Sequence, residues 1–377
     1  MAAIIFLFLT FSAVCALYTG IGWARYYYHR RSSKASACPQ DEKTTQSPPT
    51  FKIQPLTPFD WQTTEPEKHR PYKPKYNLTM SIEKTTLSDL LAIDNTYLDR
   101  ITLRRQIMAD HEETVLAAND ASLPAIQELY TWMVGTYLPT RYPDLFVLVS
   151  SPSTSLHHPS LYNKVTDESY PVALDSSTSG VEILRTLGGL VEDDLLFLLP
   201  SSDGDGYALQ AFVTCFPNGF DTRRKLGLKL RDIHTPVPGY AEKLAKSMDR
   251  WFDRLEVGTV VRRFNWTVQP HDRLFAPSGN HLYEGDDVQP IEAEIDRSEW
   301  QTYVRTERQF VHRLPRTRAV LFSFKTYLYP IRDIKAEGLG ETLAQAIDGL
   351  QGGNVPGMYY YKRAAVWGDS VQRYLRS

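Results

Sequence analysis

Apolar runs of strand length, separated by strong turn signals, dominate the second half of this chain. Residues 195–199 and 209–215 flank the sequence SSDGDG at 201–206, a pattern that predicts a β-hairpin. Residues 257–269 and 320–329 alternate between apolar and polar side chains, as strands with one buried face do. This half of the chain therefore restricts the fold to one built around an antiparallel sheet.

Helical periodicity surrounds these strands. Apolar residues recur at helical spacing over residues 87–101 and 240–255, and further helices are expected over 121–137, 339–350 and 365–375. A hairpin, a helical middle and later antiparallel strands together predict an α+β fold, with helices packed on one antiparallel sheet.

The N-terminus carries an uncharged apolar run, Ile4–Trp23, which has about the length of 20 residues that a transmembrane helix needs. A cleaved signal peptide is the alternative, but no basic region precedes the run and no small-x-small site ends it. Arg25, Arg30 and Arg31 follow directly, which favours a cytoplasmic C-terminal body. We expect a single-pass membrane anchor with its basic flank over residues 1–31, preceding the sheet.

Composition suggests how the rest is divided. Residues 32–75 are rich in Ser, Thr, Gln and Pro, and are expected to form a linker that becomes a surface-hugging extended segment. The folded domain is expected over residues 76–350, followed by a C-terminal helical extension over 351–377.

Charge and cysteine usage exclude several classes of function. The net charge of −2 and the isoelectric point near 6.5 give no basic face for nucleic-acid binding. The three cysteines imply no disulfide framework and are too few for a four-cysteine iron–sulfur cluster. The chain also lacks a G-x-S-x-G nucleophile elbow, a P-loop and a G-x-G-x-x-G dinucleotide motif.

His234 is the first candidate ligand. It stands in KLGLKLRDIHTPVPG at 225–239, where Pro236, Pro238 and Gly239 restrict the backbone around one imidazole. A neutral imidazole can hold haem iron, whereas a structural role is the commoner fate of a lone histidine. The sequence argues against zinc, because no other His or Cys stands at ligand spacing from His234. Cys215 is an alternative thiolate ligand, although a cysteine at the end of an apolar strand is more often inert.

Two charged segments raise further candidates. RTERQFVHRLP at 305–315 forms a strand or a helix, and its guanidinium groups are suited to carboxylates such as haem propionates. The alternative for this segment, and for Arg263, is a solvated edge laced with salt bridges. An inward carboxylate of the acidic run 192–194 could bind an amine or relay protons, although such runs more often face solvent.

Six sequence pieces together resemble the α-subunit of haem-dependent oxidative N-demethylase, in a group of haem-binding PAS-fold proteins. The resemblance covers roughly residues 76–350, and the pieces IHTPVPG and RTERQ are its most specific parts. The pieces are LSDLLAIDNTYLDR at 87–100, LVEDDLLFLL at 190–199, TCFPNGFDTRRKLGLKLRDIHTPVPG at 214–239, RFNW at 263–266, VRTERQFVHRLP at 304–315 and KTYLYP at 325–330.

The resemblance implies a PAS-like antiparallel sheet that holds haem through His234, with oxygen on the distal face. Arg263, Arg308 and Arg313 are then expected to bind the propionates, and Glu307 or Asp193 to act in the distal pocket. A small secondary amine, such as dimethylamine, would be oxidised to a primary amine and formaldehyde.

In such proteins the electrons come from NADPH through FMN and an iron–sulfur centre on partner subunits. The extra N-terminal anchor suggests a single-pass protein of the endoplasmic reticulum that draws electrons from an NADPH-dependent reductase. The alternatives are a haem-PAS sensor of gas or haem, and a haem carrier. A sensor usually needs an output domain, and only about 25 residues follow Leu350.

Overall fold

A seven-stranded antiparallel sheet organises the structure, a computed structural model that describes residues 52–150, 159–289 and 302–377. Its strand order is β1–β8–β9–β10–β6–β7–β2, and every neighbouring pair is antiparallel. The strands are β1 (Glu83–Thr85), β2 (Leu116–Ala118), β6 (Asp194–Pro200), β7 (Tyr207–Val213), β8 (Val260–Gln269), β9 (Tyr303–Arg313) and β10 (Val320–Pro330).

The expected hairpin is present as β6 and β7, which pair from Leu195 with Val213 to Pro200 with Tyr207. The turn between them contains Gly204 and Gly206, both with positive φ, a conformation that glycine adopts without strain. The segment that the sequence left open as strand or helix is strand β9, which pairs with β10 along its whole length. β-Branched and aromatic residues in both segments favour this extended pairing.

A second, smaller sheet and several helices lie beside the large sheet. The three strands of the small sheet are β3 (Phe146–Ser150), β4 (Pro159–Asn163) and β5 (Glu168–Pro171), in that order. The longer helices are α2 (Tyr97–Asp110), α4 (Leu123–Trp132), α6 (Gly180–Gly188), α8 (Lys246–Arg254), α10 (Gly340–Gly352) and α12 (Ala364–Arg376). The short ones are α3 (Glu112–Val115), α5 (Leu138–Arg141), α7 (Leu230–Ile233), α9 (Ile331–Ala336) and α11 (Met358–Tyr361).

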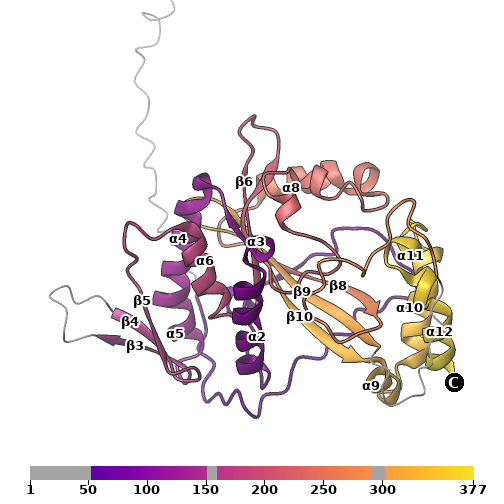
Figure 1. The fold of residues 1–377 in the computed structure, drawn as a ribbon, viewed down its shortest axis with the longest axis horizontal. Coiled ribbons are helices and arrows are strands. Elements are labelled where there is room, and N and C mark those ends of the chain that lie inside the picture. The colour runs from indigo at the N-terminus through magenta and orange to yellow at the C-terminus, as the bar shows by residue number, and fades with distance from the viewer. Residues whose placement is uncertain (1–51, 151–158, 290–301) are drawn as a thin grey trace, which may run out of the picture. The chain divides into compact units, whose positions relative to one another are not determined.

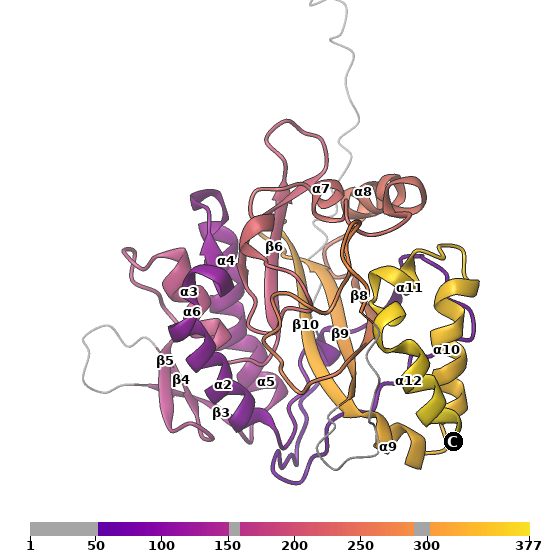
Figure 2. The same ribbon diagram turned by 45° about the vertical axis from the view of Figure 1, so that its right-hand side comes forward.

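Helices cover both faces of the large sheet. Helices α2, α4, α5 and α6 gather on one side of it, and α10, α11 and α12 gather on the other (Figures 1 and 2). Two hydrophobic clusters result, because neighbouring residues of a strand point to opposite faces. Phe310 of β9 belongs to the cluster that contains Leu129 of α4, whereas Val311 belongs to the cluster that contains Phe252 of α8 and Ile347 of α10.

The chain segments on either side of the expected domain pack onto these clusters. Trp61 packs against the first cluster and Tyr72 is buried in the second, so residues 52–75 are an extended strap held by the core. The C-terminal residues 351–377 form α11 and α12, and Trp367 of α12 is fully buried. Both segments therefore belong to the packed structure.

The fold class expected from the sequence needs one correction. The described residues form an α+β fold with antiparallel sheets, but none of their helices is long and apolar enough to cross a membrane. The longest, α2, has 14 residues, whereas a span needs about 20 apolar ones. The expected transmembrane helix Ile4–Trp23 lies outside the described residues. The expected location at the endoplasmic reticulum depends on that span and stays a prediction.

Candidate functional site

A cavity of about 300 Å³ lies on the face of the large sheet that carries α8 and α11, at the lower end of the size range of cofactor pockets (roughly 300–1,000 Å³). Apolar side chains line most of it. They come from β6, β7, α7, α8 and α11, and include Leu196, Leu198, Leu209, Leu230, Met248, Trp251, Phe252 and Met358. Polar and charged side chains from β8, β9 and the neighbouring loops supply the remaining wall.

His234 lines this cavity directly after α7. Its Nδ1 lies 2.7 Å from the carbonyl oxygen of Leu230, and a carbonyl can only accept, so Nδ1 carries the proton. The Tyr240 ring stacks on the imidazole at 4.6 Å. Burial lowers the pKa of His234 to about 4. The ring is therefore neutral near pH 7, with the lone pair on Nε2.

The neutral tautomer is the one that iron needs. Metal-bound histidines usually donate their other N–H to a carbonyl or carboxylate, which fixes the ring orientation. In this protein the carbonyl oxygen of Leu230, one helical turn before His234, accepts the Nδ1–H hydrogen bond. In the described part of the chain no hydrogen-bond partner of Nε2 is found. The backbone turns away at Gly239, whose φ is +72° and where a Cβ would meet Val355 at 2.8 Å.

Two cationic side chains in the cavity wall are well placed for an anion. Arg263 of β8 has a buried Nε without a partner among the described residues, and burial lowers the pKa of its guanidinium. Lys225 lies with Nζ 4.0 Å from the centroid of the Phe220 ring, and burial lowers its pKa to about 8. Buried cations without close acidic partners are costly, which makes an anionic ligand a natural counterpart.

Glu307 of β9 supplies a carboxylate to the same cavity. One oxygen, Oε2, accepts hydrogen bonds from Gln309 Nε2 at 2.8 Å and Asn265 Nδ2 at 3.4 Å. The other, Oε1, is buried and has no partner within the described residues. The strand geometry explains this arrangement. Gln309 lies two residues along β9 on the same face, and Asn265 is the cross-strand neighbour of Glu307.

Of the residues expected from the sequence, the cavity brings together His234, Glu307 and Arg263. Arg313 is buried elsewhere, donating to the Leu255 carbonyl at 2.7 Å and to the Tyr207 hydroxyl at 2.8 Å. Its donors are occupied by groups of the protein itself, which leaves it no role in binding a ligand of this cavity.

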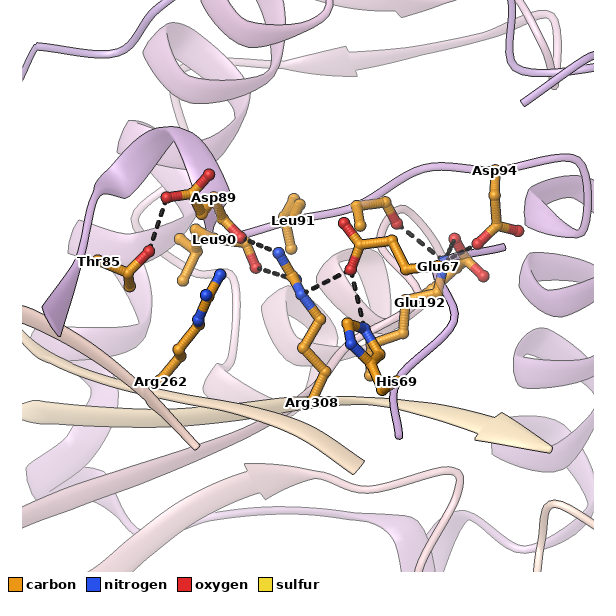
Figure 3. Close-up of polar contacts among 12 residues, drawn as sticks. Glu67, His69, Thr85, Asp89, Leu90, Leu91, Asp94, Glu192, Arg262 and Arg308 are labelled. Atoms are coloured by element: carbon orange, nitrogen blue, oxygen red, sulfur yellow. Dashed lines mark hydrogen bonds and ion pairs between the residues drawn. The ribbon is translucent and has the colours of Figure 1, made fainter. Parts of the chain in front are cut away.

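Arg308 lies on the opposite face of the sheet, since it follows Glu307 in a strand. It pairs with Glu67 at 3.1 Å and donates to the carbonyls of Asp89 and Leu90. Figure 3 shows this cluster, in which Arg308 points from β9 toward the extended strap and the 87–91 turn. The resemblance motifs 87–100 and 304–315 therefore meet here, away from the cavity.

Asp193 also lies apart from the cavity. It lines a small internal space of about 10 Å³ together with Glu192 and Tyr97. Burial raises the pKa of Asp193 to about 7, and its Oδ1 has no partner in the described residues. The neighbouring Glu192 pairs at 2.8 Å with Lys325, which also pairs with Asp94 at 2.7 Å. The acidic run thus faces the interior and not solvent.

Cys215, the alternative ligand, is fully buried and does not line the cavity. Burial raises the pKa of its thiol to about 12, so the thiolate that could bind iron is disfavoured. This side chain packs as an apolar residue, 3.9 Å from the carbonyl oxygen of Arg104.

Sequence reasoning did not single out three further residues of the site: Lys225, His281 and Lys362. Lys225 stands in the same 225–239 stretch as His234, so its position was a usable signal. His281 stacks on Tyr361 at 4.4 Å, and burial lowers its pKa to about 3. His281 and Lys362 come from a loop and from the C-terminal segment, and no local pattern marks either of them.

The donor set fits haem. It offers a neutral imidazole whose Nε2 has no partner among the residues that the structure describes, apolar walls for a flat ring, and the cationic groups of Arg263 and Lys225 for carboxylates. Around the described residues no cluster of three or more His, Cys, Asp or Glu side chains that could hold a bare metal ion is found.

A comparison with protein families agrees with this fit. The family model described as "Haem-dependent oxidative N-demethylase, alpha subunit-like" matches residues 81–372. The match takes in the cavity-lining residues of β8, β9 and α11, and it extends past the C-terminal boundary expected from the sequence. The chain therefore belongs to the family of haem-dependent oxidative N-demethylase alpha-subunit-like proteins, a family of haem-dependent oxidoreductases.

Proposed function

We propose that the chain binds haem in the cavity of about 300 Å³, where Nε2 of His234 would hold the iron, and catalyses oxidative N-demethylation of a small amine. The observation that carries this proposal is the neutral His234, which donates Nδ1–H to the Leu230 carbonyl and whose Nε2, beside an apolar cavity, has no partner in the described part of the chain. Membership of the family supports the cofactor and the class of reaction.

Arg263 and Lys225 are the groups that hold the propionates. Both line the cavity with His234, and burial disfavours the charge of each in the absence of an anion. The resemblance suggested this role for Arg263, Arg308 and Arg313. Arg263 keeps it in this proposal. Lys225 replaces the other two, whose guanidinium groups are directed to other parts of the protein.

Glu307 is the group that receives the amine. A small amine is protonated near pH 7, and the unpartnered Oε1 of Glu307 accepts one of its N–H groups in a charge-assisted hydrogen bond. Haem supplies the activation of O2. The balanced reaction converts a secondary N-methyl amine, O2, two electrons and two protons into a primary amine, formaldehyde and water.

The electrons come from a partner protein. The chain has three cysteines and no dinucleotide motif, so we assign NADPH, FMN and the iron–sulfur centre to an associated reductase. The family description as an alpha subunit supports an electron-transfer partner.

The ligand assignment is tested by reconstituting the chain with haemin and recording the Soret band. His234→Ala should abolish the band or displace it, because this change removes Nε2, the nitrogen assigned to the iron. His111→Ala is the matched control, since His111 is exposed and stacks on Phe275 away from the cavity. An unchanged spectrum for the His234 variant would refute the assignment.

The reaction is tested by formaldehyde release from an amine panel with NADPH and an added reductase. Turnover that disappears with Glu307→Gln supports the demethylase activity and the role of Oε1. Haem binding without formaldehyde from any amine would instead leave a gas or haem sensor, or a haem carrier, as the function.

A further inference from the structure

We propose that Lys362, which directly follows α11, is a positioning residue that orients Glu307 so that one carboxylate oxygen stays free for the amine. The inference deepens the proposed function, and it rests on the assignment of Glu307 to amine binding. Residues 351–377 were expected to be a mere extension, whereas Lys362 places this segment within the site.

The first step is the anchoring of Lys362. Its side chain is only 3% exposed, and Nζ donates to Asn265 Oδ1 at 3.0 Å and to the Trp266 carbonyl oxygen at 2.5 Å. No carboxylate contacts this ammonium directly among the described residues. A buried cation held by two neutral acceptors is expensive for stability, which is unusual for a group that serves packing alone.

The second step is the orientation of the Asn265 amide. A lysine ammonium can only donate, so the amide oxygen of Asn265 must face Lys362. The amide nitrogen then faces the other way, and Nδ2 lies 3.4 Å from Glu307 Oε2. Lys362 therefore decides which end of this amide meets the carboxylate.

The third step is the asymmetry of Glu307. Both amide donors, from Asn265 and Gln309, converge on Oε2, and Oε1 is left buried without a described partner. If Lys362 loses its donors, the Asn265 amide is free to turn over and to present its oxygen to the carboxylate. That contact is repulsive, so Glu307 would lose both a donor and its fixed rotamer.

The charge of Lys362 acts in the same direction. Burial lowers the pKa of Lys362 to about 8, which leaves the ammonium the main form near pH 7; of the charged groups, Glu307 favours the ammonium and Arg263 opposes it. Lys362 thus places a positive charge near the Glu307 carboxylate, and because its hydrogen bonds go to Asn265 and Trp266 it does not block Oε1.

The test compares Lys362→Met with Lys362→Arg in the haem-loaded full chain. Dimethylammonium chloride serves as the probe, and its affinity is measured by isothermal titration calorimetry together with KM and kcat. Lys362→Met should weaken binding and raise KM about tenfold, while the Soret band is unchanged. The arginine variant should recover most of the affinity, because it retains charge and donors.

A double variant separates positioning from a structural role. In a Glu307→Gln background, Lys362→Met should have little further effect on amine binding, because its influence passes through the carboxylate. Additive losses would overturn the proposal. Asn265→Ala, which leaves Lys362 in place, should reproduce the defect and serves if the methionine variant folds poorly.

Lys335→Met is the matched control. Lys335 of α9 also anchors the C-terminal segment, donating to the Tyr374 carbonyl at 2.8 Å, but it does not line the cavity. This variant should leave amine affinity unchanged.

A crystal structure of the amine-free Lys362→Met variant keeps the two proposals distinguishable. A turned Asn265 amide or a moved Glu307 carboxylate supports positioning, even if no amine binds the wild-type protein. An undisturbed Asn265–Glu307 pair overturns the role of Lys362 while leaving the proposed function intact. Failure of the amine to bind the wild-type protein would instead count against the proposed function.

Discussion

At the scale of single residues, the two faces of β9 have separate tasks. Glu307 contributes its carboxylate to the cavity, whereas Arg308, the next residue, joins a network on the other face. That network balances buried cations against buried carboxylates, including the pairs of Lys325 with Asp94 and Glu192. Removing one partner of such a pair destabilises the folded state by about 3–5 kcal/mol, because the other charge is left unpaired in the interior.

Asp193 beside this network gives a pH-dependent prediction. Burial raises its pKa from an ordinary value of 3.8 to about 7, so the folded state holds a proton that the unfolded state releases from about pH 4. Stability therefore falls as the pH rises from about 4 to about 7. The difference in pKa corresponds to about 4 kcal/mol at most.

We expect Asp193→Asn to remove this part of the pH dependence. Urea denaturation gives the free energy of unfolding of both proteins. Relative to the wild type, the variant should become more stable as the pH rises from 4 to 8. Asp369→Asn, at an exposed position of α12, is the control and should follow the wild-type curve. A variant that tracks the wild type at every pH would show that Asp193 ionises normally.

At the scale of elements, α10 sets the position of the cavity-lining residue Tyr76. The Tyr76 amide donates to the Gly349 carbonyl at 3.1 Å, and the Asn354 amide donates to the Tyr76 carbonyl at 3.2 Å. A Cβ on Gly353 would lie 1.7 Å from the Tyr76 oxygen. The end of this helix can therefore approach the strap only because a glycine stands there.

Gly353→Ala should push the strap away from α10. We expect a loss of about 1–3 kcal/mol in the free energy of unfolding, the usual cost of overpacking, together with weaker haem binding because Tyr76 moves. Gly352→Ala is the neighbouring control, since a Cβ there meets nothing within 4 Å. Thermal unfolding and haemin titration of both variants check this, and equal behaviour of the two would contradict it.

At the scale of the whole described unit, the cavity is closed by segments far apart in sequence. Tyr76 directly follows the strap, His234 comes from the segment after α7, and Tyr361 and Lys362 come from the C-terminal segment. The Lys362–Asn265 hydrogen bond joins residues 97 positions apart. A site assembled in this way depends on the integrity of the second hydrophobic cluster.

Removing residues 351–377 should therefore abolish haem binding. The deletion takes Met358 and Tyr361 from the cavity wall and the fully buried Trp367 from the core. Thermal unfolding followed by far-ultraviolet circular dichroism should occur at a lower temperature. Added haemin should no longer give the Soret band of the protein-bound form. A stable, haem-binding truncated protein would mean that this segment is dispensable, as its position after the expected domain suggested.

Local patterns in the sequence were sufficient for several strands and for one candidate ligand. The turn residues at 201–206 and the alternating runs specify antiparallel pairing, because strand periodicity and turn chemistry are properties of adjacent residues. The prolines and Gly239 around His234 indicated a restricted backbone, and this histidine does line the cavity. The sequence left the segment of Glu307 and Arg308 open as strand or helix and assigned both residues to the haem site, so it did not show that only one of them lines the cavity.

Only the tertiary structure decided which of these two residues lines the cavity. The face of β9 that receives α8 and α11 holds the cavity, and the face that receives α2, α4 and α6 holds the Arg308 network. Contacts between distant segments occupy the hydrogen-bond donors of Arg313 and orient the Asn265 amide toward Lys362. The sequence by itself thus determined the β6–β7 hairpin with its turn, the alternating strands β8 and β10, and the candidate histidine. Long-range packing determined which charged residues share a cavity, because a side chain's partners depend on what is folded against it.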